Sequence, residues 1–192
     1  MTQRIIVGIS GASGAIFGRR ILEMLNDAAN VESHLVVTPA AERTISLELH
    51  RNALSALSTL ATVRHSCDDV SASIASGSFR SDGMIIAPCS MRTLSAIAHG
   101  LADNLLTRAA DVMLKERRRL VLLAREAPLH AGHLEAMVKV TNLGGIIFPP
   151  APAFYAKPQT IDDIVTQIAA RSLELLGVVV ESSIQRWDPP PT

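Results

Sequence analysis

The chain has 192 residues, 48% of them hydrophobic, so it is long enough to bury a substantial core, and a single domain is expected. Its 18 basic and 18 acidic residues cancel, which argues against binding to nucleic acid or a membrane surface through overall charge, and aromatic residues for base stacking make up only 3%. Two cysteines without C-x-x-C spacing, and no apolar run of membrane-spanning length, predict a reduced, cytoplasmic protein.

The first predicted elements are a strand, a glycine-rich turn and a helix. The apolar run 5–7 predicts the strand, the turn covers 8–15, and apolar residues between 17 and 28 recur on one helical face. Glycines let backbone N–H groups approach a phosphate, and a helix N-terminus adds partial positive charge. The spacing G-x-x-G-x-x-G is neither the dinucleotide nor the P-loop pattern. The turn alone therefore leaves two interpretations open: a phosphate cradle, or a tight connection that binds nothing.

The remaining elements alternate between strands and helices. Strands are expected at 31–37, 62–65, 83–87, 120–124 and 146–148, with Pro88 ending the strand 83–87. Thr38 and Pro39 have the properties of an N-cap and a first helical residue. Helices are expected at 39–48, 52–60, 69–76, 90–99, 104–116, 130–142 and 161–176. This alternation predicts an α/β fold, a Rossmann-like or flavodoxin-like three-layer sandwich with a mostly parallel sheet.

The C-terminal part of the chain contains a stiff loop and a short tail. Four prolines within 149–158 predict an extended, stiff loop before the last helix. After Trp187 the chain reads Asp-Pro-Pro-Pro-Thr, which we expect to be disordered or held by a partner. We therefore expect one α/β domain over 1–186 and a tail over 187–192.

Polar residues gather in the loops that follow the predicted strands. In open parallel sheets, ligands bind beyond the carboxyl ends of the strands. The hydroxyls of Ser13, Thr38, Ser90 and Thr93 suit a phosphate and the polar edge of a heterocycle, and Arg125 supplies a bidentate donor. A chain without net charge thus concentrates its donors at one edge of the sheet.

Some charged residues have two interpretations. The adjacent Arg125 and Glu126 could form an ordinary surface ion pair, but their position directly after a buried strand favours a function. Arg108 and Lys115 share one helical stripe, which in a single subunit is more often a solvated face. Formation of an oligomer would change that interpretation.

The histidines and cysteines are expected to be structural. His130 and His133 are spaced i, i+3 on a helix and could form one edge of a metal site, but no nearby residue completes a ligand set. Cys89 follows a proline that ends a strand, and no His or Asp partner can be assigned to it. We therefore expect no metal site and a buried, unreactive Cys89.

Seven stretches, in order, cover nearly the whole chain: GISGASGA (8–15), ASIASGS (72–78), PCSM with Thr93 (88–93), LTRAADV (106–112), LKERR (114–118), REAPL (125–129) and PPAPAFY (149–155). In this combination and spacing they resemble the UbiX-type flavin prenyltransferases, long described as the small subunit of phenolic acid or 3-polyprenyl-4-hydroxybenzoate decarboxylases. The resemblance implies transfer of a dimethylallyl group from dimethylallyl monophosphate to N5 and C6 of reduced FMN. The product, prenylated FMN, would serve a separate UbiD-type decarboxylase.

The resemblance also implies roles for individual residues. It assigns the FMN contacts to Gly11, Ala12, Ser13, Thr38, Ser90, Met91, Arg92, Thr93 and Arg125. The family usually has serine where this chain has Thr38, so the hydroxyl is kept. Residues implied to hold the prenyl phosphate are Lys115, Arg125, Tyr155 and Arg171, with Arg108 and Glu48 nearby. We expect Glu126 to move protons with Ser13 as relay, and Lys115 to stabilise the leaving phosphate without a metal.

The family is described as a homo-oligomer, a dodecamer with active sites between subunits, which would account for the stripe of Arg108 and Lys115. Two alternatives remain. An FMN-dependent cysteine decarboxylase of the same fold group would carry P-x-M-N-x-x-M-W and P-A-S-A-N-T motifs, whereas this chain reads Pro-Cys-Ser-Met-Arg-Thr and has no P-x-M-N. A non-catalytic FMN carrier subunit of an aromatic acid decarboxylase would bind flavin without turnover. Whether the donor is a monophosphate or a diphosphate also stays open.

Overall fold

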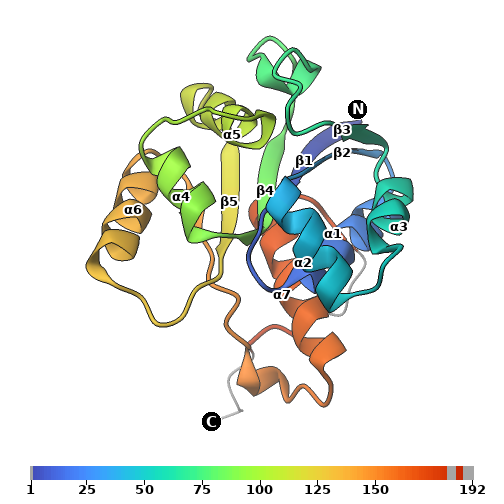
Figure 1. Cartoon of the computed structure of the whole chain (residues 1–192). Helices are drawn as coiled ribbons and strands as arrows, with labels where there is room; N and C mark the ends of the chain where they lie inside the picture. The colour runs from blue at the N-terminus through green and yellow to red at the C-terminus, as the bar shows by residue number, and fades with distance from the viewer. Residues whose placement is uncertain (1, 181–184, 188–192) are drawn as a thin grey trace.

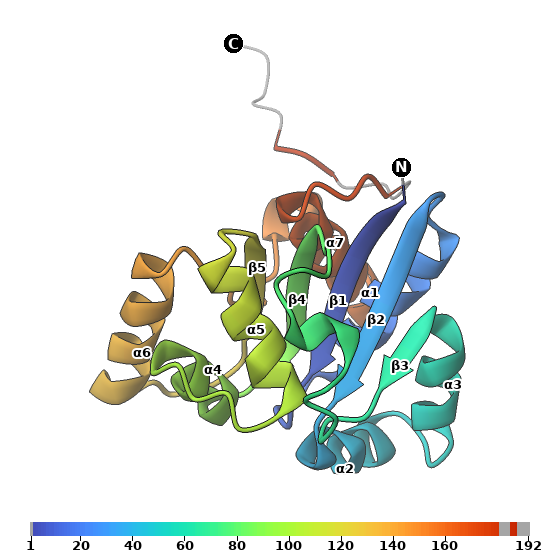
Figure 2. The ribbon, with the colours of Figure 1, turned by 90° about the horizontal axis from the view of Figure 1, so that it is seen from above.

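The computed structural model describes residues 2–180 and 185–187; except for Trp187, the predicted tail lies outside this part of the chain. Six strands form one parallel sheet in the order β3-β2-β1-β4-β5-β6 (Figures 1 and 2). The strands are β1 (Gln3–Ile9), β2 (Val31–Val37), β3 (Val63–His65), β4 (Gly83–Cys89), β5 (Arg119–Ala124) and β6 (Ile146–Ile147). This is the strand order of dinucleotide-binding doubly wound sheets, so the predicted α/β fold is confirmed.

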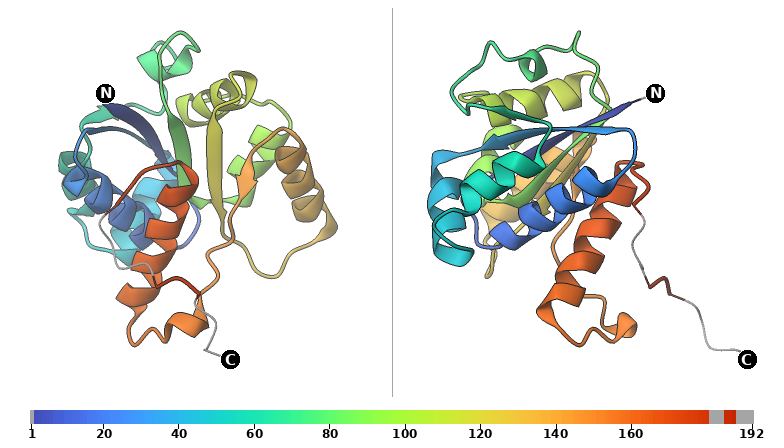
Figure 3. Two further views of the ribbon diagram at one scale, coloured as in Figure 1. Left: turned by 180° about the vertical axis from the view of Figure 1, so that it is seen from behind. Right: turned by 90° about the vertical axis from the view of Figure 1, so that its right-hand side faces the viewer.

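Helices cover both faces of the sheet, as the three layers in the right-hand view of Figure 3 show. One face carries α1 (Ala15–Asp27), α2 (Pro39–Glu48), α3 (Ala53–Leu60) and α7 (Ile161–Leu175). The other face carries α4 (Met91–Ala98), α5 (Leu105–Lys115), α6 (Ala131–Asn142) and the short 3-10 turn η1 (Ser73–Ala75). Each face has its own apolar cluster, and strands buried on both sides explain why their sequences are almost continuously apolar. Within the described residues, no helix is both long and apolar enough to cross a membrane.

Three sequence predictions need correction. The helix expected at 69–76 is only η1, because the Asp69 carboxylate accepts hydrogen bonds from the backbone N–H and the hydroxyl of Ser71 and so competes with helical bonding. Strand β4 continues through Pro88 to Cys89, since a register shift after Ile86 leaves the proline out of the ladder. The loop at 149–158 contains a second 3-10 turn, η2 (Phe154–Ala156).

The strand order reverses between β1 and β4, and the chain leaves these two strands toward opposite faces. Their ends are joined by the buried Ser10, whose hydroxyl donates to the Pro88 carbonyl (3.0 Å) and accepts from the Ser90 N–H (2.8 Å). Such a reversal opens a crevice at the carboxyl edge of a parallel sheet. The fold therefore places the ligand crevice between the loops that follow β1 and β4.

Candidate active site

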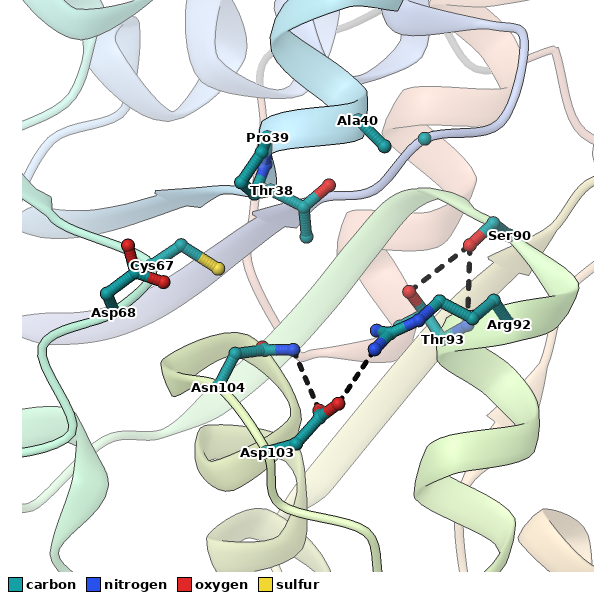
Figure 4. Close-up of a pocket in the computed structure, with 11 residues that line it drawn as sticks. Thr38, Pro39, Ala40, Cys67, Asp68, Ser90, Arg92, Thr93, Asp103 and Asn104 are labelled. Carbon is teal, nitrogen blue, oxygen red and sulfur yellow. Dashed lines mark hydrogen bonds and ion pairs between the residues drawn. The ribbon is translucent and has the colours of Figure 1, made fainter.

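A cavity of about 400 Å³ lies at this reversal point (Figure 4). Its walls come from the ends of β1, β2 and β4, from the segment after β3 and from the start of α5. The residues that line it are Gly11, Thr38, Pro39, Ala40, Cys67, Asp68, Ser90, Arg92, Thr93, Asp103 and Asn104. Five of the eleven, Gly11, Thr38, Ser90, Arg92 and Thr93, are among the predicted FMN contacts.

Three helices begin at the wall of this cavity. The side chains of Thr38, Ser90 and Asn104 cap α2, α4 and α5 by accepting hydrogen bonds from backbone N–H groups two or three residues into each helix, at 3.2, 3.3 and 3.1 Å. Each helix start contributes partial positive charge and N–H groups without a partner inside the helix. The cavity therefore suits an anionic group such as a phosphate.

Helix α1 also begins at this edge, but its N-terminus is occupied. Glu48, the last residue of α2, accepts hydrogen bonds from the backbone N–H groups of Gly14 and Ala15, each at 2.8 Å. Partial loss of hydration raises the pKa of Glu48, but hydrogen bonds from the Ser13 hydroxyl and the two N–H groups, and the charge of Arg125, outweigh this and hold it below its ordinary value. A carboxylate of the chain itself takes these donors, which favours the second interpretation of the glycine-rich turn, a connection that holds no phosphate at the start of α1.

Gly11 is required by a close approach between the β1–α1 turn and α2. A Cβ atom at this position would lie 2.5 Å from the Cβ of Ala40, in the first turn of α2. The turn and α2 are therefore in direct contact, and the open cavity lies on the side of α4 and α5.

The wall opposite α2 contains polar residues that sequence reasoning missed. Arg92 donates to the Asp103 carboxylate (2.7 Å), and this hydrogen bond holds the pKa of Asp103 below its ordinary range. The Cys67 thiol points toward the centre of the cavity in Figure 4, and burial raises its pKa. Asn104 could have been found from sequence, since it precedes a predicted helix and Asn is a favoured N-cap. Cys67 and Asp103 carried no such signal.

The predicted proton-transfer residues are only partly brought together. Ser13 contacts Glu48, and the charge of Arg125 acts on the same carboxylate. Glu126 is exposed, and its carboxylate accepts from the backbone N–H of Ala127 (3.0 Å). Its expected partnership with Ser13 stays a prediction. Of the other predicted FMN contacts, Ala12 and Met91 are buried beside the cavity-lining residues.

Two residues expected to hold the prenyl phosphate lie on α5, away from the cavity. Arg108 donates to the Ala75 carbonyl (3.1 Å) and pairs with Asp111 (2.8 Å). Lys115 is the last residue of α5 and pairs with Glu116. It follows the cavity-lining Asn104 by eleven residues, or roughly 16 Å along the helix. Lys115 therefore lies near the opposite edge of the sheet from the cavity of its own subunit.

Two further phosphate-binding candidates are Tyr155, in η2, and Arg171, in the second half of α7. Both η2 and α7 extend beyond the sheet in Figures 1 and 3. Tyr155 packs edge-on against Trp187, with ring centroids 5.5 Å apart. Arg171 pairs with Glu174 (2.9 Å), which also accepts from Arg186. Neither residue is among those that line the cavity.

His130 and His133 lie side by side, and Cys89 is buried in the core. The rings of His130 and His133 stack with centroids 3.6 Å apart at the start of α6. In the described ranges, His, Cys, Asp and Glu form no group of three placed to hold a metal ion. Cys89 is fully buried, and burial raises the pKa of its thiol far above the ordinary value, as predicted for an unreactive residue.

A doubly wound parallel sheet with a cavity of about 400 Å³ at its reversal point, faced by helix N-termini, is typical of nucleotide- and flavin-binding α/β proteins. The model of the flavoprotein family matches residues 1–173. The flavin prenyltransferase UbiX of Escherichia coli K12 is 51% identical over 186 residues, 96% of this chain and 98% of its own length. The chain therefore belongs to the flavoprotein family and, within it, to the UbiX flavin prenyltransferases.

Solved structures agree with this assignment. The structure of AnUbiX (PadA1) in complex with FMN and dimethylallyl pyrophosphate has a TM-score of 0.94 and 46% identity, with both chains fully covered. A dodecameric FMN-dependent UbiX-like decarboxylase from Escherichia coli O157:H7 has a TM-score of 0.93 and 46% identity, over 97% of this chain and all of that one.

Proposed function

We propose that this chain is a flavin prenyltransferase that transfers a dimethylallyl group from dimethylallyl monophosphate to N5 and C6 of reduced FMN. The observation that carries the proposal is the cavity at the β1–β4 reversal point, faced by three helix N-termini, in a chain of the UbiX family. In the reaction, the C–O bond to phosphate breaks, the phosphate leaves with the electron pair, and N5 bonds to the allylic carbon. The double bond of the C5 unit then takes up a proton and forms the second bond, to C6, while N5 and C6 each lose a proton, so the flavin gains C5H8. Reduced FMN supplies the electron-rich nitrogen and ring carbon.

The residues around the cavity fit FMN. A volume of about 400 Å³ is within the range of ligand pockets. The phosphate is assigned to the starts of α2 and α4, where Thr38, Ser90 and Thr93 offer hydroxyls and Arg92 offers a charged donor. Gly11 lines the cavity while its missing side chain lets the β1–α1 turn lie against α2.

Proton transfer is assigned to carboxylates beside the β1–α1 turn. The flavin gives up two protons, from N5 and C6, and the double bond of the C5 unit takes up one, so a group that accepts and returns protons must lie within reach. The Ser13 hydroxyl helps to lower the pKa of Glu48, and this carboxylate is a second candidate beside the predicted pair of Ser13 and Glu126. A glutamate of ordinary pKa is already ionised at neutral pH, and the lowered pKa keeps Glu48 in this form, which can accept a proton.

The prenyl phosphate is assigned to residues of more than one subunit. Lys115, Arg108, Arg125, Tyr155 and Arg171 are donors that stabilise a leaving phosphate, and Lys115 is too far along α5 to reach the cavity of its own chain. We therefore propose a homo-oligomer, a dodecamer, with active sites between subunits. The dodecameric relative supports this proposal.

The decisive experiment incubates the protein without oxygen with reduced FMN and dimethylallyl monophosphate, and measures the flavin by mass spectrometry. A gain of one C5H8 unit is expected. FMN binding without this gain would favour a carrier subunit, and carbon dioxide released from an aromatic acid or a cysteine-containing substrate would favour a decarboxylase. Repeating the assay with the diphosphate decides the preferred donor.

Lys115→Ala tests the phosphate site. The KM for the prenyl phosphate should rise at least tenfold while the FMN dissociation constant changes less than twofold, and Lys139→Ala, on α6, should change neither. Coexpression of Lys115→Ala with Glu126→Gln chains tests the shared site, because mixed oligomers contain some sites with both native residues. Activity of the mixture above that of either variant is expected; an activity no higher than their average would place both residues in one subunit.

We also propose that the product is consumed by a UbiD-type decarboxylase, as family membership suggests. Flavin extracted from the reaction should restore activity to a separately purified decarboxylase that lacks its cofactor. Unmodified FMN is the control and should restore none.

A further inference from the structure

Asp103 places a negative charge on the wall of the cavity that is proposed to hold the phosphate of FMN. It lies directly before α5, and Asp68 is the other acidic residue of this wall. Because like charges repel, a carboxylate beside a phosphate weakens the binding of that phosphate unless it also orders a group that attracts it. The contacts of Asp103 identify such a group.

Both oxygens of the Asp103 carboxylate accept hydrogen bonds from the protein. Oδ1 accepts from the side-chain amide of Asn104 (3.0 Å) and from the hydroxyl of Thr107 (3.2 Å). Asn104 and Thr107 are also the two members of the capping box that begins α5, so the backbone of this helix fixes their side chains. The carboxylate is therefore attached to a rigid element on one side of the cavity.

The second oxygen, Oδ2, joins this side of the cavity to α4. It accepts from Nη2 of Arg92 at 2.7 Å, and Arg92 lies in the first turn of α4 (Figure 4). A guanidinium has five N–H donors, and within the part of the chain that the structure describes the Arg92 side chain donates only to Asp103. Its other N–H groups are available to a ligand at the cavity wall.

The contact with Asp103 orders a side chain that would otherwise have many rotamers, since Arg92 is 67% exposed. A long side chain loses rotamer freedom when it binds a ligand, and a contact that orders it beforehand lowers this cost. An exposed ion pair contributes little to the stability of a fold. The main effect of this pair is therefore on the position of the guanidinium.

We propose that Asp103 is a positioning residue for the phosphate of FMN: it holds the guanidinium of Arg92 at the cavity wall, between the starts of α4 and α5, with the other donors open to the ligand. The proposal rests on the proposed function, which places the phosphate at the starts of α2 and α4. Asp103 acts through Arg92, so its favourable effect on binding should vanish when Arg92 is removed.

The test compares dissociation constants of FMN and of riboflavin, which lacks the phosphate, for the wild type and Asp103→Asn. This substitution keeps the size of the side chain and removes the charge that holds Arg92. FMN binding should weaken at least fivefold, and riboflavin binding less than twofold.

Asp68→Asn is the matched control. It removes a carboxylate from the same wall, and no hydrogen bond or ion pair joins Asp68 to Arg92 in the described ranges. This variant should bind FMN at least as tightly as the wild type, because it removes a repulsive charge and leaves the guanidinium in place.

A double-mutant cycle separates positioning from a general effect on the cavity. Arg92→Ala should weaken FMN binding at least tenfold. The double variant Arg92→Ala/Asp103→Asn should bind FMN no more weakly than Arg92→Ala, since no guanidinium is left to hold and one negative charge is gone.

Three results would overturn the inference: FMN binding by Asp103→Asn as tight as that of the wild type, an equal loss for riboflavin, or additive losses in the double variant. Melting temperatures check that each variant folds, and Asp103→Ser takes the place of Asp103→Asn if the latter does not. A wild type that binds riboflavin as tightly as FMN also overturns the inference, although flavin binding holds. A wild type that binds neither flavin contradicts the proposed function.

Discussion

Helices α1 and α4 begin on either side of the reversal point, directly after the two central strands, yet their N-terminal N–H groups have different hydrogen-bond acceptors. The start of α1 is held by a charged carboxylate from another helix, Glu48, whereas α4 is capped by the neutral hydroxyl of its own Ser90 and faces the cavity. The glycine-rich turn lies at α1, and the helix start that faces the cavity lies at α4. The difference teaches that the helix N-terminus available to an anion is decided as much by neutralising one helix start as by leaving another free.

Placing a carboxylate at the start of α4, as Glu48 does at the start of α1, should have the largest effect on FMN binding. Ser90→Asp keeps an N-cap acceptor and adds a carboxylate at the cavity wall. FMN binding should weaken at least a hundredfold, about 3 kcal/mol, because the new charge repels the phosphate. Titration with riboflavin, which has no phosphate, should show a change below threefold.

The same substitution at another helix start is the control for Ser90→Asp. Thr160→Asp, at the N-cap of α7, should leave FMN binding unchanged. Equal weakening of riboflavin and FMN by Ser90→Asp would place the phosphate elsewhere and remove the contrast between the two helices.

Gly11→Ala should push the β1–α1 turn away from α2. The added Cβ would meet the Cβ of Ala40 at 2.5 Å, and this overlap should cost about 2 kcal/mol of unfolding free energy, a fall in Tm of roughly 4–8 °C. Gly132→Ala in α6 is the control, since its Cβ meets only the ring of His130, at 3.2 Å. Equal melting temperatures for the two variants would show that the turn and α2 are not in tight contact.

Asn104→Ala removes the cap of the third helix start at the cavity. It breaks a capping box in which Asn104 and Thr107 bond each other's backbone N–H groups. The free energy of unfolding, measured with urea, should fall by about 1 kcal/mol. FMN affinity should fall less than fivefold, because the charge of the cavity is unchanged. The control Asn142→Ala, at the end of α6, should lose less unfolding free energy. A hundredfold loss of FMN affinity in Asn104→Ala would instead make the start of α5 the main phosphate site.

Glu48→Gln should show the smallest effect, and one that depends on pH. Because the pKa of Glu48 is lower in the folded chain than its ordinary 4.5, the unfolded chain binds more protons between these two pKa values. The charge therefore stabilises the wild type above pH 4.5, by less than about 1 kcal/mol at this exposed site, and the benefit is lost as pH falls through the folded pKa. Urea unfolding at pH 7 and pH 3 should show a smaller difference in unfolding free energy between wild type and variant at pH 3; a constant difference would contradict the assignment of charge.

Most of the fold follows from local patterns in the sequence. The buried strands are continuous apolar runs, and Thr38-Pro39 and Asn104 mark helix starts by their own chemistry. The helix expected at 69–76 failed because the Asp69 side chain, and not apolar spacing, decides the local hydrogen bonding. Strand β4 passes through Pro88 because a shift in pairing register, which only the neighbouring strand reveals, frees the proline from the ladder.

The candidate site, like the fold, can be predicted from the sequence only in part. The ends of parallel strands share one edge, so the strand-end rule placed Thr38, Ser90 and Thr93 at the cavity correctly. The strand-end rule could not place Glu48 at the start of α1. Glu48 and Ala15 are 33 residues apart along the chain, and only the packing of α2 brings them together. Nor does any spacing reveal that Lys115 lies at the far edge of the sheet, since this follows from the length and direction of α5.

The position of β4 between β1 and β5 also has a kinetic consequence. Strands β1, β2 and β3 follow one another in the chain and pair as neighbours, but the cavity needs β4, which comes fourth and inserts beside β1. The loops after the first three strands supply Gly11 and Thr38 to the cavity wall. Ser90, Arg92 and Thr93 follow β4 and join the cavity only when β4 is in place. The rate at which flavin fluorescence is quenched during refolding should therefore equal the rate at which β4 pairs with β1. Ligand binding would then report when the sheet is assembled.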